Sequence, residues 1–329
     1  MTPFRHARRD IVRAFARISG ATLLTGLLCG GALAQDNYPS QPIRLVIPYP
    51  AGGTTDLIGR QLADQLGKEL GQTVIVDNRP GASTNIGAEM VSRAKPDGYT
   101  LLMASTGQVR NPVLGPMPSF ELSSLEPISL VSKLAFVLAA NPKTPFNTGA
   151  ELIKAAKAEP GKLTVSSAQL DMYVELLNRR ADMKLLHVPY KGGAQASTDA
   201  ISGQVNMVFA LLPVLQPHIQ GGKLKLLGVT SDKRLAAFPD VPTFTEIGVD
   251  YDVSIWYGLM APAGTPKPII DRLAKVTEKL MSSPEMGTRI RAVGAEPAWS
   301  RPDEFKAQLR SETAFWQQIG RQMPQLIQK

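Results

Sequence analysis

Short loops of glycine and hydroxyl residues contain the residue types with which this sequence could bind a ligand. The most distinctive loop is Ala51–Asp56, which reads Ala-Gly-Gly-Thr-Thr-Asp and follows the β-branched run Ile43–Ile47. Apolar residues then recur at every fourth position from Ile58 to Leu70, which predicts a helix with one buried face. The order of these elements is therefore strand, glycine loop and helix start.

A strand, a glycine loop and a helix start in this order are favourable for binding an anion. Gly52 and Gly53 have no Cβ, so a ligand can approach the backbone closely. The first helical turn offers unpaired N–H groups at the positive end of the helix dipole. The alternative is an ordinary strand-to-helix turn capped by Thr54 or Thr55, because most such turns need a cap and few bind anions.

Three further loops with glycine or serine follow strand-like runs, at Asn78–Ser83, Ser105–Gly107 and Pro189–Gly193. The sequence contains no Gly-x-Ser-x-Gly elbow, HExxH, phosphate loop or GxGxxG. His187 and His218 are isolated in the sequence, without the clustered partners that a metal or catalytic site needs. We therefore expect a binding protein that needs no metal or cofactor, and not an enzyme.

The N-terminal segment has the pattern of a secretory signal peptide. Residues 1–17 hold five arginines and one aspartate, residues 18–31 are uncharged, and Ala32–Ala34 forms a small-x-small cleavage site. We expect export to the periplasm and cleavage near Ala34, which also removes the only cysteine, Cys29. The net charge of +8 then falls by four, to +4, because five arginines and one aspartate are lost.

Strand-like and helical runs alternate after residue 35. This predicts an α/β protein with parallel-rich sheets, which bind ligands beyond the carboxyl ends of their strands. The expected strands are Ile43–Ile47, Thr73–Val76, Thr100–Ala104, Phe136–Ala139, Lys162–Val165, Leu185–Val188, Val205–Phe209, Leu224–Val229 and Ile255–Met260. The expected helices are Asp56–Leu70, Ile86–Ala94, Ala150–Ala158, Gln195–Ile201, Pro268–Met281 and Pro302–Ile319.

Two stretches rich in proline or polar residues, at 141–145 and around Asp250, predict boundaries between domains. We expect residues 35–140 and 253–329 to form a first lobe and residues 141–252 to form a second. Two chain crossings between two α/β lobes are typical of a hinge.

A set of short motifs runs along the chain at Pro48–Asp56, Asp77–Ala82, Asn85–Ala88, Pro96–Leu102, Pro160–Leu163, His187–Ala194, Gly221–Leu224, Val229–Arg234, Pro239–Thr243, Trp256–Leu259 and Ala261–Pro266. As a set, these motifs resemble those of the Bug family. They cover essentially the whole mature chain in order. Bug proteins are periplasmic receptors similar to the substrate-binding component of tripartite tricarboxylate transporters. The resemblance implies a two-lobed, Venus flytrap periplasmic-binding-protein fold that binds a small carboxylate.

The resemblance also implies which residues bind the ligand. The first lobe would contribute Ala51, Gly52, Gly53, Thr54 and Asp56 with Ser105, Thr106 and Gly107, and the second lobe Tyr190, Lys191, Gly192, Gly193 and Ala194. Backbone N–H groups and hydroxyls can hold a carboxylate through charge-assisted hydrogen bonds without a buried counter-ion. Lys191 has an alternative as a solvated charge at the edge of its lobe.

One segment departs from the family pattern. Family members place a glycine- and serine-rich turn before the next helix, whereas Leu163–Leu177 lacks those glycines and the histidine that follows them. Ser166 and Ser167 remain as the expected donors of the second lobe, and Asp171 would repel an anion. Either the receptor binds an unusual ligand or this part of the pocket is degraded.

The partner of such a receptor stays open at this point. It could deliver its ligand to a permease of the tripartite type or present it to a membrane sensor kinase. A periplasmic hydrolase is a third alternative, for which the sequence shows no nucleophile and base. We expect a monomer. We also expect no binding of nucleic acid, because no basic run with interleaved aromatics is present. No later segment approaches the apolar length of a membrane span.

Cleavage of the signal peptide can be tested directly. Intact-mass measurement on a periplasmic extract should give the mass of a chain that begins at Gln35, because Ala32–Ala34 is the expected cleavage site. A mass that still includes Cys29, with or without a lipid, would contradict this expectation.

Overall fold

The computed structural model describes residues 38–115, 120–168 and 170–324. It divides into two compact units, Met1–Ser40 and Gln41–Lys329. Of the first unit only residues 38–40 are described, so the predicted signal peptide lies outside the described residues. Everything below concerns the second unit. Among its described helices, none is both long enough and apolar enough to cross a membrane.

A mixed ten-stranded sheet runs through this unit. The strand order is β2-β1-β3-β9-β4-β7-β5-β6, and β8 and β10 also pair with β4. The strands are β1 (Ile43–Ile47), β2 (Val74–Asn78), β3 (Thr100–Ser105), β4 (Leu125–Ala140), β5 (Thr164–Ala168), β6 (Leu186–Tyr190), β7 (Met207–Leu211), β8 (Lys225–Val229), β9 (Ser254–Pro262) and β10 (Glu296–Pro297). Pairing is parallel within β2-β1-β3 and within β6-β5-β7, as expected for a parallel-rich sheet at each end.

Strand β4 joins the two parallel groups. Its first part, Leu125–Ala135, pairs antiparallel with β9, and its last part, Phe136–Ala140, pairs antiparallel with β7 and β8. The sequence predicted only the last part, because Pro127, Ser129 and Ser132 interrupt the apolar pattern of the first part. The pairing with β9 shifts register beside these residues. The lobe boundaries near residues 140 and 253 stay a prediction.

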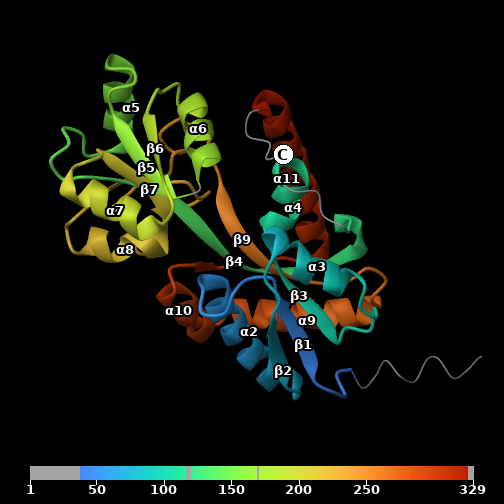
Figure 1. Cartoon of the computed structure of the whole chain (residues 1–329). Coiled ribbons are helices and arrows are strands. Elements are labelled where there is room, and N and C mark those ends of the chain that lie inside the picture. The colour runs from blue at the N-terminus through green and yellow to red at the C-terminus, as the bar shows by residue number, and fades with distance from the viewer. Residues whose placement is uncertain (1–37, 116–119, 169, 325–329) are drawn as a thin grey trace, which may run out of the picture. The chain divides into compact units, whose positions relative to one another are not determined.

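Helices pack against both parallel groups. They are α2 (Thr54–Leu70), α3 (Asn85–Ser92), α4 (Gly107–Leu114), α5 (Gly149–Ala158), α6 (Asp171–Arg180), α7 (Gly193–Ser202), α8 (Leu212–Gln220), α9 (Lys267–Met281), α10 (Pro284–Ala292) and α11 (Pro302–Gln322). Figure 1 shows α2, α3 and α9 gathered around β1 to β3, and α5 to α8 gathered around β5 to β7. The long C-terminal helix α11 packs against α4 and β4.

Buried aromatic rings connect β4 and β7 with helices α6 and α11. Phe136 of β4 lies 4.6 Å from Tyr173 of α6 and 5.2 Å from Phe209 of β7, measured between ring centroids. Tyr173 also meets Trp316 of α11 edge to face. These rings are all buried, so the core continues from the β4–β7 pair to α6 and α11.

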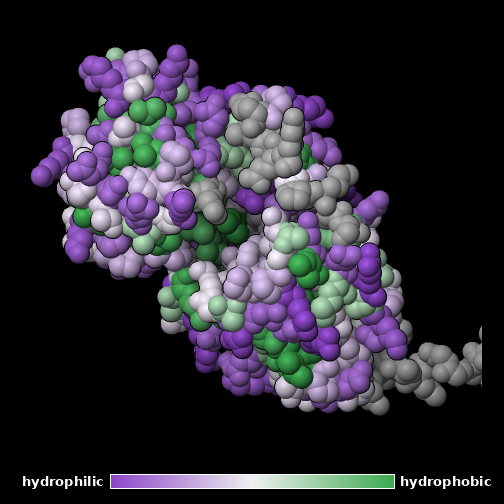
Figure 2. Space-filling view, viewed as in Figure 1, coloured by the Kyte–Doolittle hydropathy of each residue, from purple (hydrophilic) through white to green (hydrophobic). Residues whose placement is uncertain are grey.

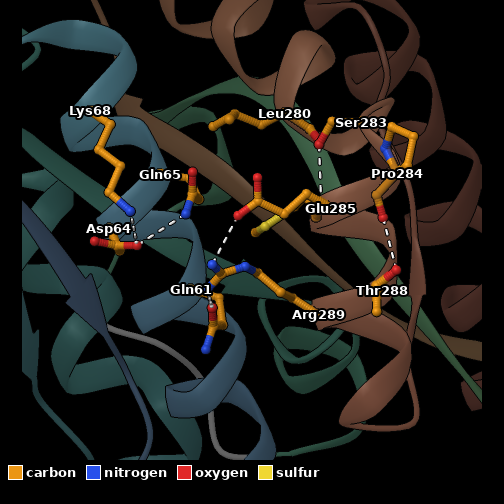
Figure 3. A network of polar contacts seen from close by, with 11 residues as sticks. Gln61, Asp64, Gln65, Lys68, Leu280, Ser283, Pro284, Glu285, Thr288 and Arg289 are labelled. Carbon is orange, nitrogen blue, oxygen red and sulfur yellow. Dashed lines mark hydrogen bonds and ion pairs between the residues drawn. The ribbon is translucent and has the colours of Figure 1, made fainter.

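The first turn of helix α2 directly follows the glycine loop. The residues expected on its buried face, from Ile58 to Leu70, are at most 6% exposed. On its outer side, Arg289 of α10 donates a hydrogen bond of 2.8 Å to Gln61 (Figure 3). Arg289 also pairs with Glu285 of its own helix. The sheet and α10 together hold α2, and therefore its first turn, in place.

The packing of α11 on the sheet leads to a prediction about Gly258 of β9. A Cβ at this position would lie 2.6 Å from Phe305 of α11 and 3.0 Å from the carbonyl oxygen of Ser129. Because the backbone oxygen cannot move away cheaply, Gly258→Ala should lower the free energy of unfolding by about 1–3 kcal/mol. Chemical denaturation measures the change. Gly53→Ala is the control, since its Cβ would meet nothing closer than 3.8 Å, and equal stability of the two variants would contradict the packing.

Candidate functional site

The loop before α2 leaves the first turn of the helix without a side-chain cap. Gly53 is the N-cap residue, with φ −81° and ψ 170°, and no side chain of the described residues caps this helix. Thr54 and Thr55, the expected alternative caps, already belong to the helix. Tyr257 of β9 forms a hydrogen bond with Thr55. The N–H groups at this helix start therefore remain available to a ligand.

Asp56 organises this loop from the inside. Its buried carboxylate accepts hydrogen bonds of 2.9 Å from the backbone N–H of Gly52, from Arg60 and from Asn78. Burial alone would raise the pKa of the Asp56 carboxyl, but these hydrogen bonds outweigh burial and hold the pKa below its ordinary value. Asp56 therefore stays ionised and fixes the loop conformation with the charge that the helix start favours.

The loop after β3 lies against the first loop. The hydroxyl groups of Tyr49 and Ser105 are 2.8 Å apart, and the backbone N–H of Gly107 donates to the Ser105 hydroxyl at 3.1 Å. The Thr106 hydroxyl accepts a hydrogen bond from the backbone N–H of Trp256. Burial raises the pKa of the Tyr49 hydroxyl, so it stays protonated. The sequence did not indicate Tyr49, although this residue joins the two loops.

The loop between β6 and α7 repeats the arrangement at α2. Gly192 is the N-cap residue of α7, and among the described residues neither a side-chain cap nor an acidic residue of the first turn occupies this helix start. Lys191, Gly192 and Ala194 are exposed, and Gly193 is partly buried. Tyr190 donates a hydrogen bond to Asp199, which anchors the loop to its own helix. The first N–H groups of α7 are thus a second set of available donors.

Ser166 and Ser167 are fully buried at the end of β5. The Ser166 hydroxyl lies within hydrogen-bond distance of the carbonyl oxygens of Ala196 (3.0 Å) and Met207 (3.2 Å). The Ser167 hydroxyl lies 2.8 Å from His187 Nε2. Both hydroxyls therefore have partners within the protein, and they hold α7 and β6 against β5.

His187 links Ser167 to Asp171, a connection that the sequence analysis missed. His187 Nδ1 is 3.2 Å from an oxygen of Asp171, so the three residues are connected as in a serine hydrolase. Burial lowers the pKa of His187, and this effect outweighs the charge of Asp171, which raises the pKa. The net shift favours the neutral imidazole. Ser167 is 0% exposed, however, so a substrate could not reach its hydroxyl. The arrangement favours a structural role.

Polar contacts join the loops within each group of helices. Tyr49 and Ser105 connect the first two loops, and Ser167 and His187 connect β5 to β6. Among the described residues, no hydrogen bond, ion pair or ring contact joins the 51–56 loop to the 190–194 loop. Figure 2 shows the surface hollowed between the part of the chain that carries α5 to α8 and the part that carries α2 and α3. No group of three His, Cys, Asp or Glu side chains in the described chain could hold a metal ion.

Comparison with known proteins gives a consistent picture. The family described as the tripartite tricarboxylate transporter family receptor, TctC, matches residues 58–323. BugT of Bordetella pertussis is 34% identical over 298 residues, which are 88% of this chain and 91% of BugT. A UPF0065 protein of Cupriavidus necator, from the gbd 5' region, is 37% identical over 311 residues, 93% of this chain and 94% of the relative.

Solved structures show the same fold. A TctC solute-binding protein from Polaromonas, crystallised without ligand, has a TM-score of 0.79 and 28% identity, covering 87% of this chain and 99% of its own. An R. palustris protein with adipate has a TM-score of 0.70 and 28% identity, covering 86% of this chain and 97% of its own. MatC from Rhodopseudomonas palustris with bound malate has a TM-score of 0.66 and 26% identity, covering 86% of this chain and 99% of its own. This protein therefore belongs to the tripartite tricarboxylate transporter receptor family, and its fold is the two-lobed periplasmic-binding-protein fold that its resemblance to Bug receptors predicted.

Proposed function

We propose that this protein is a periplasmic receptor that captures a small carboxylate and delivers it to a membrane permease of the tripartite type. The observation that carries the proposal is the pair of helices α2 and α7. Each begins at a glycine, Gly53 or Gly192, and within the described chain neither has a side-chain cap. The ligands of two related structures, adipate and malate, are carboxylates, which supports this class of ligand.

Backbone donors account for most of the proposed binding. The N–H groups of Gly53 and Thr54 hold the carboxylate from one side, and those of Gly193 and Ala194 approach from the other. A hydrogen bond to a charged group contributes about 1.5–3 kcal/mol, so four such bonds contribute about 6–12 kcal/mol, from which the cost of association is subtracted.

The remaining site residues shape the loops in this proposal. Ser105, Thr106 and Asp56 already bond to protein groups and fix the first side of the site. Ser166 and Ser167 do the same on the second side, which leaves few hydroxyl donors for a ligand there. Tyr190 and Lys191 complete the second loop, with Tyr190 bonded to Asp199.

The second side of the proposed site is unfavourable for a second negative charge. Asp171 is the first residue of α6 and is exposed, so it places a carboxylate at the helix start where an anion would otherwise bind. One of its oxygens faces His187, whose lowered pKa leaves it neutral at pH 7. We therefore propose a monocarboxylate or zwitterion as the ligand, in preference to a dianion.

Substitution of Gly53 tests the proposed first contact. Gly53→Val places a branched side chain over the helix start and should abolish binding of carboxylates, because the ligand could no longer approach the N–H groups. The fold should persist, since the φ of Gly53 is −81° and a Cβ would meet only the Pro50 carbonyl oxygen, at 3.8 Å. Isothermal titration calorimetry gives the affinity and thermal unfolding checks the fold. Unchanged affinity in folded Gly53→Val protein would refute the contact.

A matched series of six-carbon acids tests the preference for a single negative charge. Hexanoate and 6-aminohexanoate should bind roughly a hundredfold more tightly than adipate, because adipate would meet Asp171 and find about two charge-assisted hydrogen bonds fewer for its second carboxylate. Calorimetry with the mature protein measures all three. Tight binding of adipate that survives Ser166→Ala and Ser167→Ala would instead assign the second carboxylate to the Tyr190–Ala194 loop.

A further inference from the structure

Arg110 carries a positive charge that forms no ion pair with an acidic side chain of the described residues. It lies in α4, three residues after Gly107, and is partly buried. Its Nε and one Nη2 hydrogen donate to the Asn111 side-chain oxygen, at 3.3 and 3.1 Å, and one Nη1 hydrogen donates to the Tyr173 hydroxyl at 3.0 Å. These bonds use three of its five N–H groups, so two have no partner among the described residues.

The acid that interacts most plainly with Arg110 is Glu312, and its charge is already engaged. The Glu312 carboxylate accepts hydrogen bonds from the indole N–H groups of Trp256 and Trp316. Burial raises the pKa of Glu312, and it outweighs the two indole hydrogen bonds and the charge of Arg110, which all lower the pKa. No ion pair joins Arg110 to a described carboxylate. A partly desolvated cation that forms no direct ion pair within the described chain is costly, which favours an anionic partner from outside the chain.

The surroundings of Arg110 are those of the proposed site. Its charge acts on the Tyr49 hydroxyl, which touches Ser105 in the loop just before α4. Its contact with Tyr173 reaches α6, two residues beyond Asp171. The guanidinium thus lies where the β3–α4 loop, one of the loops on the first side, faces the helix that carries Asp171 on the second side.

We infer that Arg110 is the side-chain counter-charge for the ligand carboxylate, with its two free N–H groups as donors. This inference rests on the proposed function and specifies it further: the ligand carries one carboxylate, bound between Arg110 and the start of α2, and its other end is neutral or positive beside Asp171. A site made of backbone N–H groups alone would lack a full positive charge. Arg110 adds a charge that distinguishes a carboxylate from a neutral amide or alcohol of the same shape.

The test compares variants of Arg110 with a matched arginine elsewhere. The probes are straight-chain monoacids, diacids and ω-amino acids of four to eight carbons, with hexanamide as the neutral partner of hexanoate. Calorimetry is performed with wild-type protein, Arg110→Gln, Arg110→Lys and Arg310→Gln. Arg310 is exposed on α11, so its replacement removes the same charge away from the site. Tyr173→Phe removes the hydroxyl that Arg110 contacts and keeps the ring.

Arg110→Gln should lower the affinity for every carboxylate that binds by roughly ten- to a hundredfold. The affinity for hexanamide should rise relative to that for hexanoate. The carboxylate affinity of Arg110→Lys should lie between those of Arg110→Gln and wild type, because lysine keeps the charge but not the paired donors. Arg110→Lys serves as the test if Arg110→Gln does not fold. The affinity of Arg310→Gln should stay within about twofold of wild type, and Tyr173→Phe should lose less affinity than Arg110→Gln, because within the described chain the Tyr173 hydroxyl contacts only the guanidinium. The affinity of wild type should also fall more steeply with salt than that of Arg110→Gln.

Two results would overturn the inference alone. One is unchanged carboxylate affinity in folded Arg110→Gln protein while Gly53→Val abolishes binding. The other is a loss in Tyr173→Phe equal to that in Arg110→Gln, because this would show that Arg110 acts by linking α4 to α6. Failure of wild-type protein to bind any probe in the three series would overturn the proposed function together with the inference.

Discussion

The first turn of a helix leaves backbone N–H groups without partners, and this constraint organises the loops of this receptor. A side-chain cap can meet this need, as Thr148 does for α5 and Ser283 for α10. Helices α2 and α7 begin at glycines instead, so their donors stay open. Each follows a strand of one parallel group, so each helix start lies beyond the carboxyl end of its own strand.

Contacts with neighbouring elements hold the start of α2 in place. Asp56 fixes the loop before α2 with hydrogen bonds to Gly52 and Asn78, and α10 contacts the outer side of the same helix through Arg289. Strand β4 pairs with β9 and with β7, and the aromatic core around Phe136 and Tyr173 connects β4 to α6. A donor held in advance loses little entropy when a ligand binds, so such rigidity increases affinity.

Local patterns made most of the fold predictable from the sequence. The fourfold apolar spacing of α2 appears as its buried face, and its observed start at Thr54 lies two residues before the predicted one. Helix α8 was not predicted, because Pro213 and Pro217 hide its pattern, although a proline at the first turn is compatible with a helix. Helix α4 was missed for a similar reason, since Gly107 and Pro112 are poor helix formers.

The loops of the candidate site were predictable and their internal contacts were not. Glycine and hydroxyl residues mark the loops in the sequence, whereas the Ser167–His187–Asp171 connection depends on the register between β5 and β6. The position of Arg110 depends in the same way on the packing of α4 near α6. Such contacts arise from tertiary structure, and no short sequence pattern encodes them.

The most direct test of the central claim is to observe the backbone donors themselves. Amide NMR spectra of the mature protein, titrated with hexanoate, report hydrogen bonds to individual N–H groups. The account predicts that the Gly53 and Thr54 amide protons move strongly downfield, with those of Gly193 and Ala194, as a carboxylate accepts their hydrogen bonds. Saturable binding that leaves these four amides unshifted would contradict it.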